Sequence, residues 1–255
     1  MKKQVVKIIL TSLLFFILSA VALAEDLGGE SQKLVRDFIA TVKAGNREKI
    51  ASIVSYPLSR EYPIPEVKTK RELLSCFEQI FDDYLLSKIV KSNIKKDWSE
   101  MGSRGIMLLN GLVWLDSDGK LIAVNYLSRK EKLVKERLIA AERSNLYEPL
   151  RKFQTPVCKL ETSSYRIRID DMGNGAYRYA SWKKQQGMNE KPAVIILNGE
   201  IQVLGTGGNL SYIFKLGEYT YECGIDKLGE EGAAPAHLSV LNGEAEILYQ
   251  DAEIK

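Results

Sequence analysis

The sequence predicts an α+β protein with a helix-rich N-terminal domain, a charged helical connector and a C-terminal antiparallel β-barrel or sandwich. Apolar residues recur at helical spacing between residues 35 and 90, whereas the apolar period changes to two from Thr155 onward. No helical pattern interrupts the second region, and its short apolar runs alternate with tight turns, which is typical of a barrel or sandwich. We place the domains at residues 25–127 and 154–255, joined by the connector at 128–153.

The first 24 residues have the composition of a secretory signal peptide. Three lysines precede the apolar stretch Ile8–Leu18, which is too short for a comfortable membrane span, and Ala22-Leu23-Ala24 supplies a cleavage site. An uncleaved membrane anchor is the alternative. We expect a mature chain that begins at Glu25 and lies in the periplasm or outside the cell, with no membrane span after the leader is removed.

The net charge argues against a nucleic-acid-binding protein. The full chain has a charge of +3 and the leader holds three lysines and no acid, so the mature chain has a charge of 3 − 3 = 0. A neutral chain lacks the cationic surface that nucleic acid requires. Residues 154–255 hold ten basic and fourteen acidic residues, so the C-terminal domain is mildly acidic and favours a cationic partner.

The N-terminal domain begins with two short amphipathic helices. Gly45 is suited to end the first helix, and Asn46 is suited to cap the second. The second ends at Tyr56-Pro57, because the residue before a proline avoids the α region. Thr69 and Glu72 form a capping box that opens a third helix, expected to run to residue 90. The buried face of the first helix is marked by Val35, Phe38, Ile39 and Val42.

Two apolar strands follow, at residues 105–115 and 120–127, separated by the turn residues Asp116–Gly119. Asn110-Gly111 interrupts the first strand and is interpreted as a bulge that bends it. This order of elements resembles the nuclear transport factor 2-like fold, a cone of curved sheet wrapped by helices. The resemblance covers roughly residues 32–127 and rests on "FIATVKAGNREKIASIVSYPL", "TKRELLSCFEQIF" and "RGIMLLNGLVWLDSDGKLIAVN".

The resemblance implies a pocket inside the cone, which the family uses for isomerase or dehydratase chemistry, ligand binding or scaffolding. Catalytic members that resemble the ketosteroid isomerases need a buried acid or base beside a Tyr or Asp donor. We therefore expect no catalytic residue and no cofactor, with a small-ligand or enzymatic pocket as the alternative. The strand residues expected to face inward hold no titratable group: Met107, Leu109, Val113, Leu115 and Ile122.

Continuous apolar runs indicate that both faces of this sheet are covered. A half-exposed antiparallel strand would alternate apolar with polar residues, but "IMLL", "LVWL" and "LIAV" do not. We favour cover by the protein's own helices and its C-terminal domain. A homodimer through the outer face of the sheet, which the resemblance also implies, is the alternative.

The connector has the composition of a solvated helix with a narrow apolar face, and Pro149 ends it. In the C-terminal domain, Asn198-Gly199 and Asn242-Gly243 are expected to form hairpin turns. The expected strands lie near 156–161, 164–170, 176–182, 193–197, 200–205, 210–216, 218–225, 236–241 and 244–249.

The chain has three cysteines and one histidine. An exported protein matures in an oxidising compartment, where disulfides persist. Cys158 and Cys223 lie on the inward faces of their expected strands, so we predict that they form a disulfide. Cys76 is then a small buried residue of a helix. We assign no metal site, because His237 is the only histidine and no Cys-x-x-Cys pair occurs.

The stretch "GNGAYRYASWKK" is the most aromatic part of the chain. Tyr, Trp and Arg dominate binding hot spots, so we select Tyr177, Arg178, Tyr179 and Trp182 as candidate binding residues. They are also ordinary strand residues, so packing in the core is the competing interpretation. Alternation along a strand places the tyrosines on one face and the other two residues on the opposite face, so the four do not form one patch on a regular strand.

These observations favour an exported envelope binding protein without catalytic activity. An acidic, disulfide-bonded barrel resembles the bacterial lysozyme inhibitors in general character, which implies an inhibitor-like function with another protein or a cell-wall component as the ligand. The alternatives are a small-ligand or enzymatic pocket in the N-terminal cone, and a structural partner in an envelope assembly.

Overall fold

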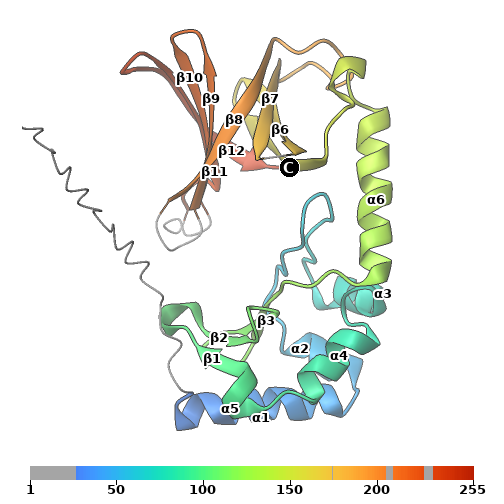
Figure 1. Ribbon diagram of the computed structural model, residues 1–255. Coiled ribbons are helices and arrows are strands. Elements are labelled where there is room, and N and C mark those ends of the chain that lie inside the picture. Colours follow the sequence, from blue (N-terminus) through green and yellow to red (C-terminus); the bar gives the residue numbers. More distant parts are fainter. Residues whose placement is uncertain (1–26, 174, 205–208, 227–231) are drawn as a thin grey trace, which may run out of the picture.

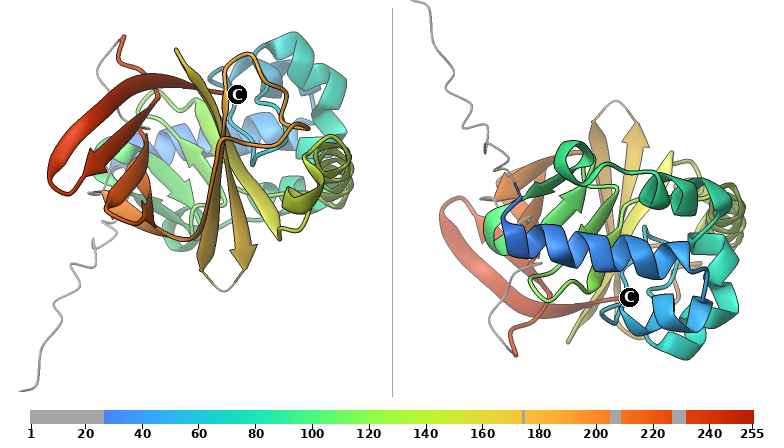
Figure 2. Two further views of the ribbon diagram at one scale, coloured as in Figure 1. Left: turned by 90° about the horizontal axis from the view of Figure 1, so that it is seen from above. Right: turned by 90° about the horizontal axis from the view of Figure 1, so that it is seen from below.

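The computed structural model describes residues 27–173, 175–204, 209–226 and 232–255, so the expected signal peptide lies outside the described residues. Figure 1 shows a helix-rich part at one end, a β-barrel at the other and one long helix, α6, that connects them. The two views in Figure 2 show that α6, in yellow-green, lies at one side of both parts. The predicted α+β class and the antiparallel C-terminal barrel are confirmed. Within the described ranges, no helix is both long and apolar enough to cross a bilayer.

The N-terminal part packs five helices against a four-stranded antiparallel sheet, as far as the structure describes it. The helices are α1 (Gly29–Lys43), α2 (Arg47–Ser52), α3 (Lys70–Ile80), α4 (Asp83–Val90) and α5 (Ile94–Asp97). The strands are β1 (Trp98–Glu100), β2 (Ile106–Leu108), β3 (Val113–Leu115) and β4 (Leu121–Val124), with a short 3-10 helix, η1 (Gly102–Arg104), after β1.

Helix ends form where the capping residues predict them. Gly45 follows α1 with a φ of +70°, a conformation that glycine adopts without strain. The Asn46 side chain accepts a hydrogen bond from the backbone N of Lys49 at 2.9 Å and caps α2. Thr69 Oγ1 accepts from the backbone N of Glu72 at 3.2 Å and caps α3.

The expected long third helix is two helices, α3 and α4. The chain leaves helical geometry at Phe81, and the Asp82 side chain then accepts a hydrogen bond from the backbone N of Leu85 at 2.9 Å. Aspartate binds free backbone N–H groups at a helix start better than it tolerates a helix interior, so Asp82 begins a new helix.

Asn110-Gly111 lies in a hairpin turn, so the predicted bulge within one long strand is wrong. β2 and β3 pair antiparallel, with Leu108 opposite Val113. The backbone N of Leu112 donates to the carbonyl O of Leu108 at 2.9 Å, and Gly111 has a φ of +83°. The apolar run is therefore folded back on itself.

The sheet buries one face fully and the other partly. The fully buried side chains beneath the helices are Ile106, Leu108, Val113, Leu115, Leu121 and Val124. Met107 and Trp114 lie on the other face and are half-buried, and Leu109 is exposed in the turn. Val113 and Leu115 face inward as expected. Directly paired residues of a hairpin lie on the same face, so Ile106 and Leu108 face inward with them in place of Met107 and Leu109. Ile122 is half-buried, and its neighbour Leu121 is fully buried instead.

Helix α6 spans Arg129–Ser144, and a short 3-10 helix, η2, spans Glu148–Leu150. The Ser128 side chain caps α6 by accepting a hydrogen bond from the backbone N of Glu131 at 3.0 Å, and it donates to the carbonyl O of Gln79. The cap therefore ties the start of α6 to the end of α3.

Eight antiparallel strands close into a barrel in the order β10-β11-β12-β5-β6-β7-β8-β9. Inward-facing residues such as Ile167, Ile169, Phe214 and Leu238 form its apolar core. The strands are β5 (Thr155–Thr162), β6 (Tyr165–Gly173), β7 (Ala176–Lys183), β8 (Val194–Leu204), β9 (Asn209–Leu216), β10 (Tyr219–Ile225), β11 (Ala236–Asn242) and β12 (Ala245–Ile254).

The predicted hairpin turn at Asn198-Gly199 is wrong. The two strands expected around it form one long strand, β8, which pairs with β7 and then with β9. Tyr179 pairs with Ile196, whereas Tyr177 pairs with Gly199, so β8 carries one extra residue at this point. The dipeptide forms a bulge that bends the strand.

Packing explains why this dipeptide bends a strand. A Cβ atom at Gly199 would lie 2.1 Å from Cε1 of Phe214, so the glycine lets this ring pack against the backbone. Asn198 has a φ of +60°, which asparagine tolerates better than most residues. By contrast, Asn242-Gly243 does form the predicted turn, since Asn242 pairs with Ala245.

The predicted Cys158–Cys223 disulfide is not formed, because the structure contains three free thiols. Both side chains are buried in the barrel core, as alternation predicted. Their strands, β5 and β10, are separated by β11 and β12, a path of three strand spacings of about 4.8 Å, whereas a disulfide needs Cα atoms within about 7 Å. Burial raises the pKa of Cys158 to about 12, so this thiol stays protonated at neutral pH.

Replacing Gly199 with alanine should destabilise the barrel by about 1–3 kcal/mol, because the new methyl group would overlap the Phe214 ring. Chemical denaturation measures this change. Gly29→Ala is the control, since a Cβ atom there meets nothing within 4 Å, and it should change the free energy of unfolding by less than about 0.5 kcal/mol. Equal stability of the two variants would contradict the packing of Phe214 on Gly199.

Candidate functional site

The connector covers one side of the barrel. Trp182 points outward from β7 yet is fully buried, and its Nε1 donates to the carbonyl O of Glu190 at 2.8 Å. The outer side of β6 and β7 is therefore part of the protein interior. The apolar residues that pack there with Trp182 and Ala180 are Ile139, Leu146, Leu150 and Phe153.

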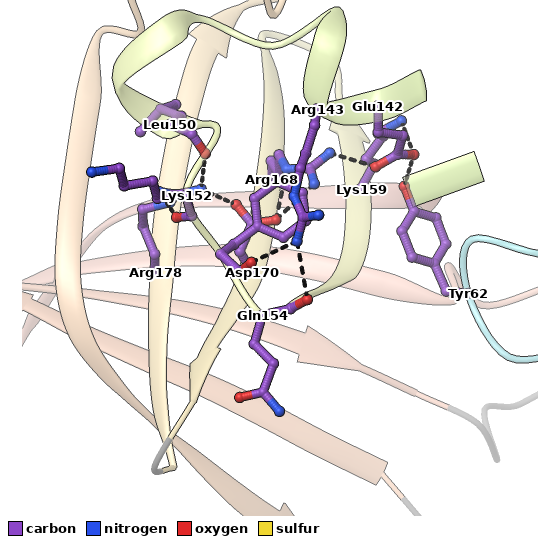
Figure 3. Close-up of polar contacts among 11 residues, drawn as sticks. Tyr62, Glu142, Arg143, Leu150, Lys152, Gln154, Lys159, Arg168, Asp170 and Arg178 are labelled. Carbon is purple, nitrogen blue, oxygen red and sulfur yellow. Dashed lines mark hydrogen bonds and ion pairs between the residues drawn. The ribbon is translucent and has the colours of Figure 1, made fainter. Parts of the chain in front are cut away.

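Charged side chains lie between the connector and this side of the barrel (Figure 3). Asp170 is central, because its Oδ1 accepts from Nε of Arg168 at 2.8 Å and its Oδ2 accepts from Nη2 of Arg178 at 2.6 Å. All three side chains are almost completely buried. We call the charged cluster the set Glu142, Lys159, Arg168, Asp170 and Arg178.

Glu142 links three parts of the chain within this cluster. Its Oε1 accepts from Oη of Tyr62 at 2.7 Å and from Nζ of Lys159 at 2.5 Å. Its Oε2 accepts from Nη1 of Arg168 at 2.6 Å. Tyr62 belongs to the segment before α3, Glu142 to α6, and the two cations to the barrel.

The environment keeps Glu142 ionised and Tyr62 protonated. Burial opposes ionisation of Glu142, but the hydrogen bonds from Lys159, Tyr62 and Arg168 outweigh it, so the pKa of Glu142 lies below its ordinary value. Burial and the contact with Glu142 raise the pKa of Tyr62 well above its usual range. Tyr62 therefore remains a hydrogen-bond donor to the carboxylate.

Carbonyl oxygens and an aromatic ring stabilise the remaining positive charge. The Phe153 ring lies beside three guanidinium groups, with the Cζ atoms of Arg143, Arg168 and Arg178 at 4.5, 4.9 and 6.0 Å from its centroid. Arg178 donates at 2.6 and 3.0 Å to two connector carbonyls, those of Leu150 and Lys152.

A second set of contacts ties the segment before α3 to the start of α6. Arg60 and Glu131 form a buried ion pair, with Nη2 and Oε2 2.6 Å apart. Glu61 pairs with Lys135 one turn further along α6. Residues 60–62 thus contact α6 near its start and near its end. Arg60 also donates to two backbone carbonyls, those of Val124 and Tyr126.

The charged cluster can position parts of the protein but offers no group for catalysis. Both of its carboxylates accept hydrogen bonds from cations, and Tyr62 stays protonated, so none of these groups is free to act as a base. In the part of the chain that the structure describes, no group of acidic, cysteine and histidine side chains could hold a metal ion. His237 instead stacks on Tyr249, with ring centroids 5.3 Å apart.

The structure does not bring the four predicted binding residues together on one surface. Tyr179 is buried inside the barrel, 5.4 Å from Phe214 between ring centroids. Arg178 and Trp182 point outward but are buried beneath the connector, and Tyr177 is half-buried. A binding role for these residues stays a prediction. Because most of them are buried, a surface that binds a partner is better sought on other strands of the barrel.

Glu142, Arg168 and Asp170 are not among the site residues predicted from the sequence. Arg168 and Asp170 alternate with the core residues of β6 and therefore have the pattern of solvent-facing residues. One signal was available, because Ala180 and Trp182 share the outward face of β7 with Arg178. A large apolar residue on that face indicates that something covers it.

A cleft of about 560 Å³ lies in the N-terminal part, between α2, α3, α4 and the start of α6. Phe77 and Phe81 stack there with centroids 4.9 Å apart. Ion pairs of Glu78 with Arg47 and Lys130 form its rim. Six charged residues line the cleft beside five apolar ones, which suits a small ligand that carries polar groups. The apolar lining consists of Val42, Ile50, Phe77, Phe81 and Leu86.

Exposed apolar side chains concentrate on the barrel strands that the connector leaves open. We call β8–β12 the uncovered half; in the described residues, β5, β6 and β7 have no large apolar side chain that is exposed. The exposed large apolar side chains of the uncovered half are Ile195, Leu197, Ile201, Val203, Leu204, Leu216, Tyr219, Ile247, Tyr249 and Ile254.

No protein-family model matches the chain, and comparisons with curated proteins and with solved structures found no match. The function is therefore argued from the geometry of these sites.

Replacing Asp170 with asparagine should lower the free energy of unfolding by about 3–5 kcal/mol, because two buried guanidinium groups would lose their carboxylate. Thermal or chemical denaturation measures this loss. Glu78→Gln removes a carboxylate that also pairs with two cations, but at an exposed site where solvent screens the charges, so it should lower the free energy of unfolding far less. Similar losses in both variants would show that burial of the cluster is unimportant.

Glu142 should make stability depend on pH. Its pKa is lower in the folded protein than the unfolded value of about 4.3, so its stabilising contribution is present above that pH and is lost as the pH falls through the folded pKa. The stability difference between the wild type and Glu142→Gln should therefore be largest above about pH 5 and shrink below about pH 4. Glu136→Gln, at an exposed position of α6, controls for charge removal. A difference that does not change with pH would contradict the assignment.

Proposed function

We propose that this chain is an exported, non-catalytic binding protein of the bacterial envelope, and that its barrel binds another protein or a cell-wall component. The observation that carries the proposal is the uncovered half of the barrel, where exposed aliphatic and aromatic side chains gather on neighbouring strands. Soluble proteins rarely leave large apolar patches in water unless the patch is an interaction site.

The covered half supports the proposal by contrast. On β6 and β7 the connector buries the outward-facing side chains, including Trp182. The protein thus shields one side of the barrel with its own chain and leaves the other side available. The leader composition of the first 24 residues supports a periplasmic or secreted location for this surface.

An inhibitor-like mode fits the chemistry of the described polar groups. The carboxylates of the charged cluster are paired with its own cations, and carbonyl oxygens accept hydrogen bonds from Arg178, so its role is to hold the barrel in place. A barrel with exposed apolar side chains on its uncovered half can block a partner without reacting with it. A structural role in an envelope assembly uses the same surface and is a variant of this proposal.

A small-ligand site in the N-terminal part is the second candidate. The cleft of about 560 Å³ with its stacked Phe77 and Phe81 favours it. We retain the nuclear transport factor 2-like cone as a proposal for residues 25–127, supported by helices that cover one face of an antiparallel sheet. A homodimer through the other face, which carries the half-buried Met107 and Trp114, belongs to the same proposal; measurement of the solution mass distinguishes it.

Arginine substitutions on the uncovered half should weaken partner binding. Immobilised mature protein is exposed to envelope extract and to peptidoglycan, and the affinity of each retained component is then measured by calorimetry. Leu197→Arg combined with Val203→Arg should reduce affinity by at least about tenfold, because a buried unpaired charge at an interface is costly.

Leu133→Arg on α6 is the matched control, since Leu133 is 53% exposed and Leu197 is 57% exposed. The control should bind within about twofold of the wild type. If the immobilised protein retained no component, or if both variants lost the same affinity, a partner site on the barrel would be refuted.

A further inference from the structure

Strand β12 has one edge without a strand partner along most of its length. On one side it pairs with β11 from Ala245 to Ala252. On the other side it pairs with β5 through Ala252, Glu253 and Ile254, and no described strand pairs with residues 245–251 there. The side-chain amide of Gln250 donates to Oγ of Ser164 at 3.0 Å, which marks the point where the β5–β6 turn stops covering this edge.

Among the described residues, the side chains along this part of β12 are largely exposed. Ile247 is 56% exposed and Tyr249 is 55% exposed. In an antiparallel ladder, every second residue directs its N–H and C=O away from the paired strand, so the open edge presents unpaired donors and acceptors. Such an edge is a template for an additional strand.

The charge of the edge identifies what kind of strand it would accept. Residues 232–254 include four acidic residues and no lysine or arginine. Proteins usually protect an open edge with lysine or proline, and residues 245–251 contain neither. The acidic residues of this segment are Glu244, Glu246, Asp251 and Glu253.

The same charges argue against pairing with a second copy of the chain. Two β12 edges paired about a two-fold axis would bring only acidic side chains toward one another, and like charges across a strand pair are destabilising. A cationic strand would instead place opposite charges beside Glu246 and Asp251. The edge therefore favours a basic partner over itself.

We propose that residues 245–251 of β12 bind an extended, lysine- or arginine-rich segment of a partner protein as an added β-strand. This inference rests on the proposed binding function and specifies its partner. Tyr249 lies opposite Ser239 and Asp251 opposite His237 on the outer face, whereas Leu248 lies opposite the core residue Val240. The bound segment accordingly alternates basic residues on the outer face with aliphatic residues on the inner face.

The probe is a peptide of alternating lysine and valine, about eight residues long, with an alternating glutamate and valine peptide of equal length as its counterpart. Calorimetry with the mature full chain should show the lysine peptide binding at least about tenfold more tightly, and its affinity should fall as salt rises from about 0.05 M to about 0.5 M. Equal affinity for both peptides would overturn the charge assignment.

Charge reversal locates the site. Glu246→Lys combined with Asp251→Lys should weaken lysine-peptide binding by at least about tenfold. Glu48→Lys combined with Glu136→Lys makes the same change in net charge at exposed positions of α2 and α6, away from the barrel, and should stay within about threefold of the wild type. If the control variant lost affinity and the β12 variant did not, the binding site would lie elsewhere and the inference would be overturned.

Backbone methylation separates strand addition from simple charge attraction. Two versions of the lysine peptide are N-methylated at alternate residues, one at the lysines and one at the valines. An added strand directs only one of these sets of N–H groups at β12, so one version should bind at least about tenfold more weakly than the other. Equal affinities would refute strand addition. If the β12 tests fail while an envelope partner still responds to substitutions on β8, only this inference falls and the proposed function stands.

Discussion

The pairing of Asp170 with Arg168 and Arg178 determines where the connector lies on the barrel. A carboxylate between two guanidinium groups in the interior is stable only while all three remain together, because separation would leave a charge without a partner in a medium of low dielectric. Arg178 also holds connector carbonyls, and Arg168 also holds Glu142 of α6, so helix, connector and barrel share one set of contacts. Since desolvation offsets much of the Coulomb energy, we infer that the cluster mainly selects one arrangement.

This arrangement gives the two sides of the barrel different properties. Burial of an aromatic residue such as Trp182 removes on the order of 150–250 Å² from water, so the connector contributes apolar packing as well as charge compensation on its side. The opposite side receives no such cover from described residues and keeps exposed residues such as Leu197 and Tyr249. A single covering element thus divides a symmetric architecture into a structural side and a side that faces other molecules.

Local patterns predicted much of the fold, whereas the charged cluster depends on contacts distant in sequence. Asn46 and Thr69 cap their helices as expected, and the period-two alternation of apolar residues correctly predicted an antiparallel barrel. The hairpin turn predicted at Asn198-Gly199 was wrong, because the residue types of a turn do not reveal that the Phe214 ring occupies the space above the glycine. Asp170 was not selected because alternation distinguishes the two faces of a strand but not whether another segment covers the outer one.

The way the barrel closes has a consequence for the order of events during synthesis. The seam between β5 and β12 is formed by residues 160–162 with residues 252–254, which are the first and last strands of the barrel in chain order. Contacts of such large sequence separation form late, because the intervening chain has to be confined first. While the chain is being synthesised, β5 has no partner at this seam until β12 is complete. Before that point the strands can form only an open sheet with two unpaired edges, the kind of edge at which another chain can pair.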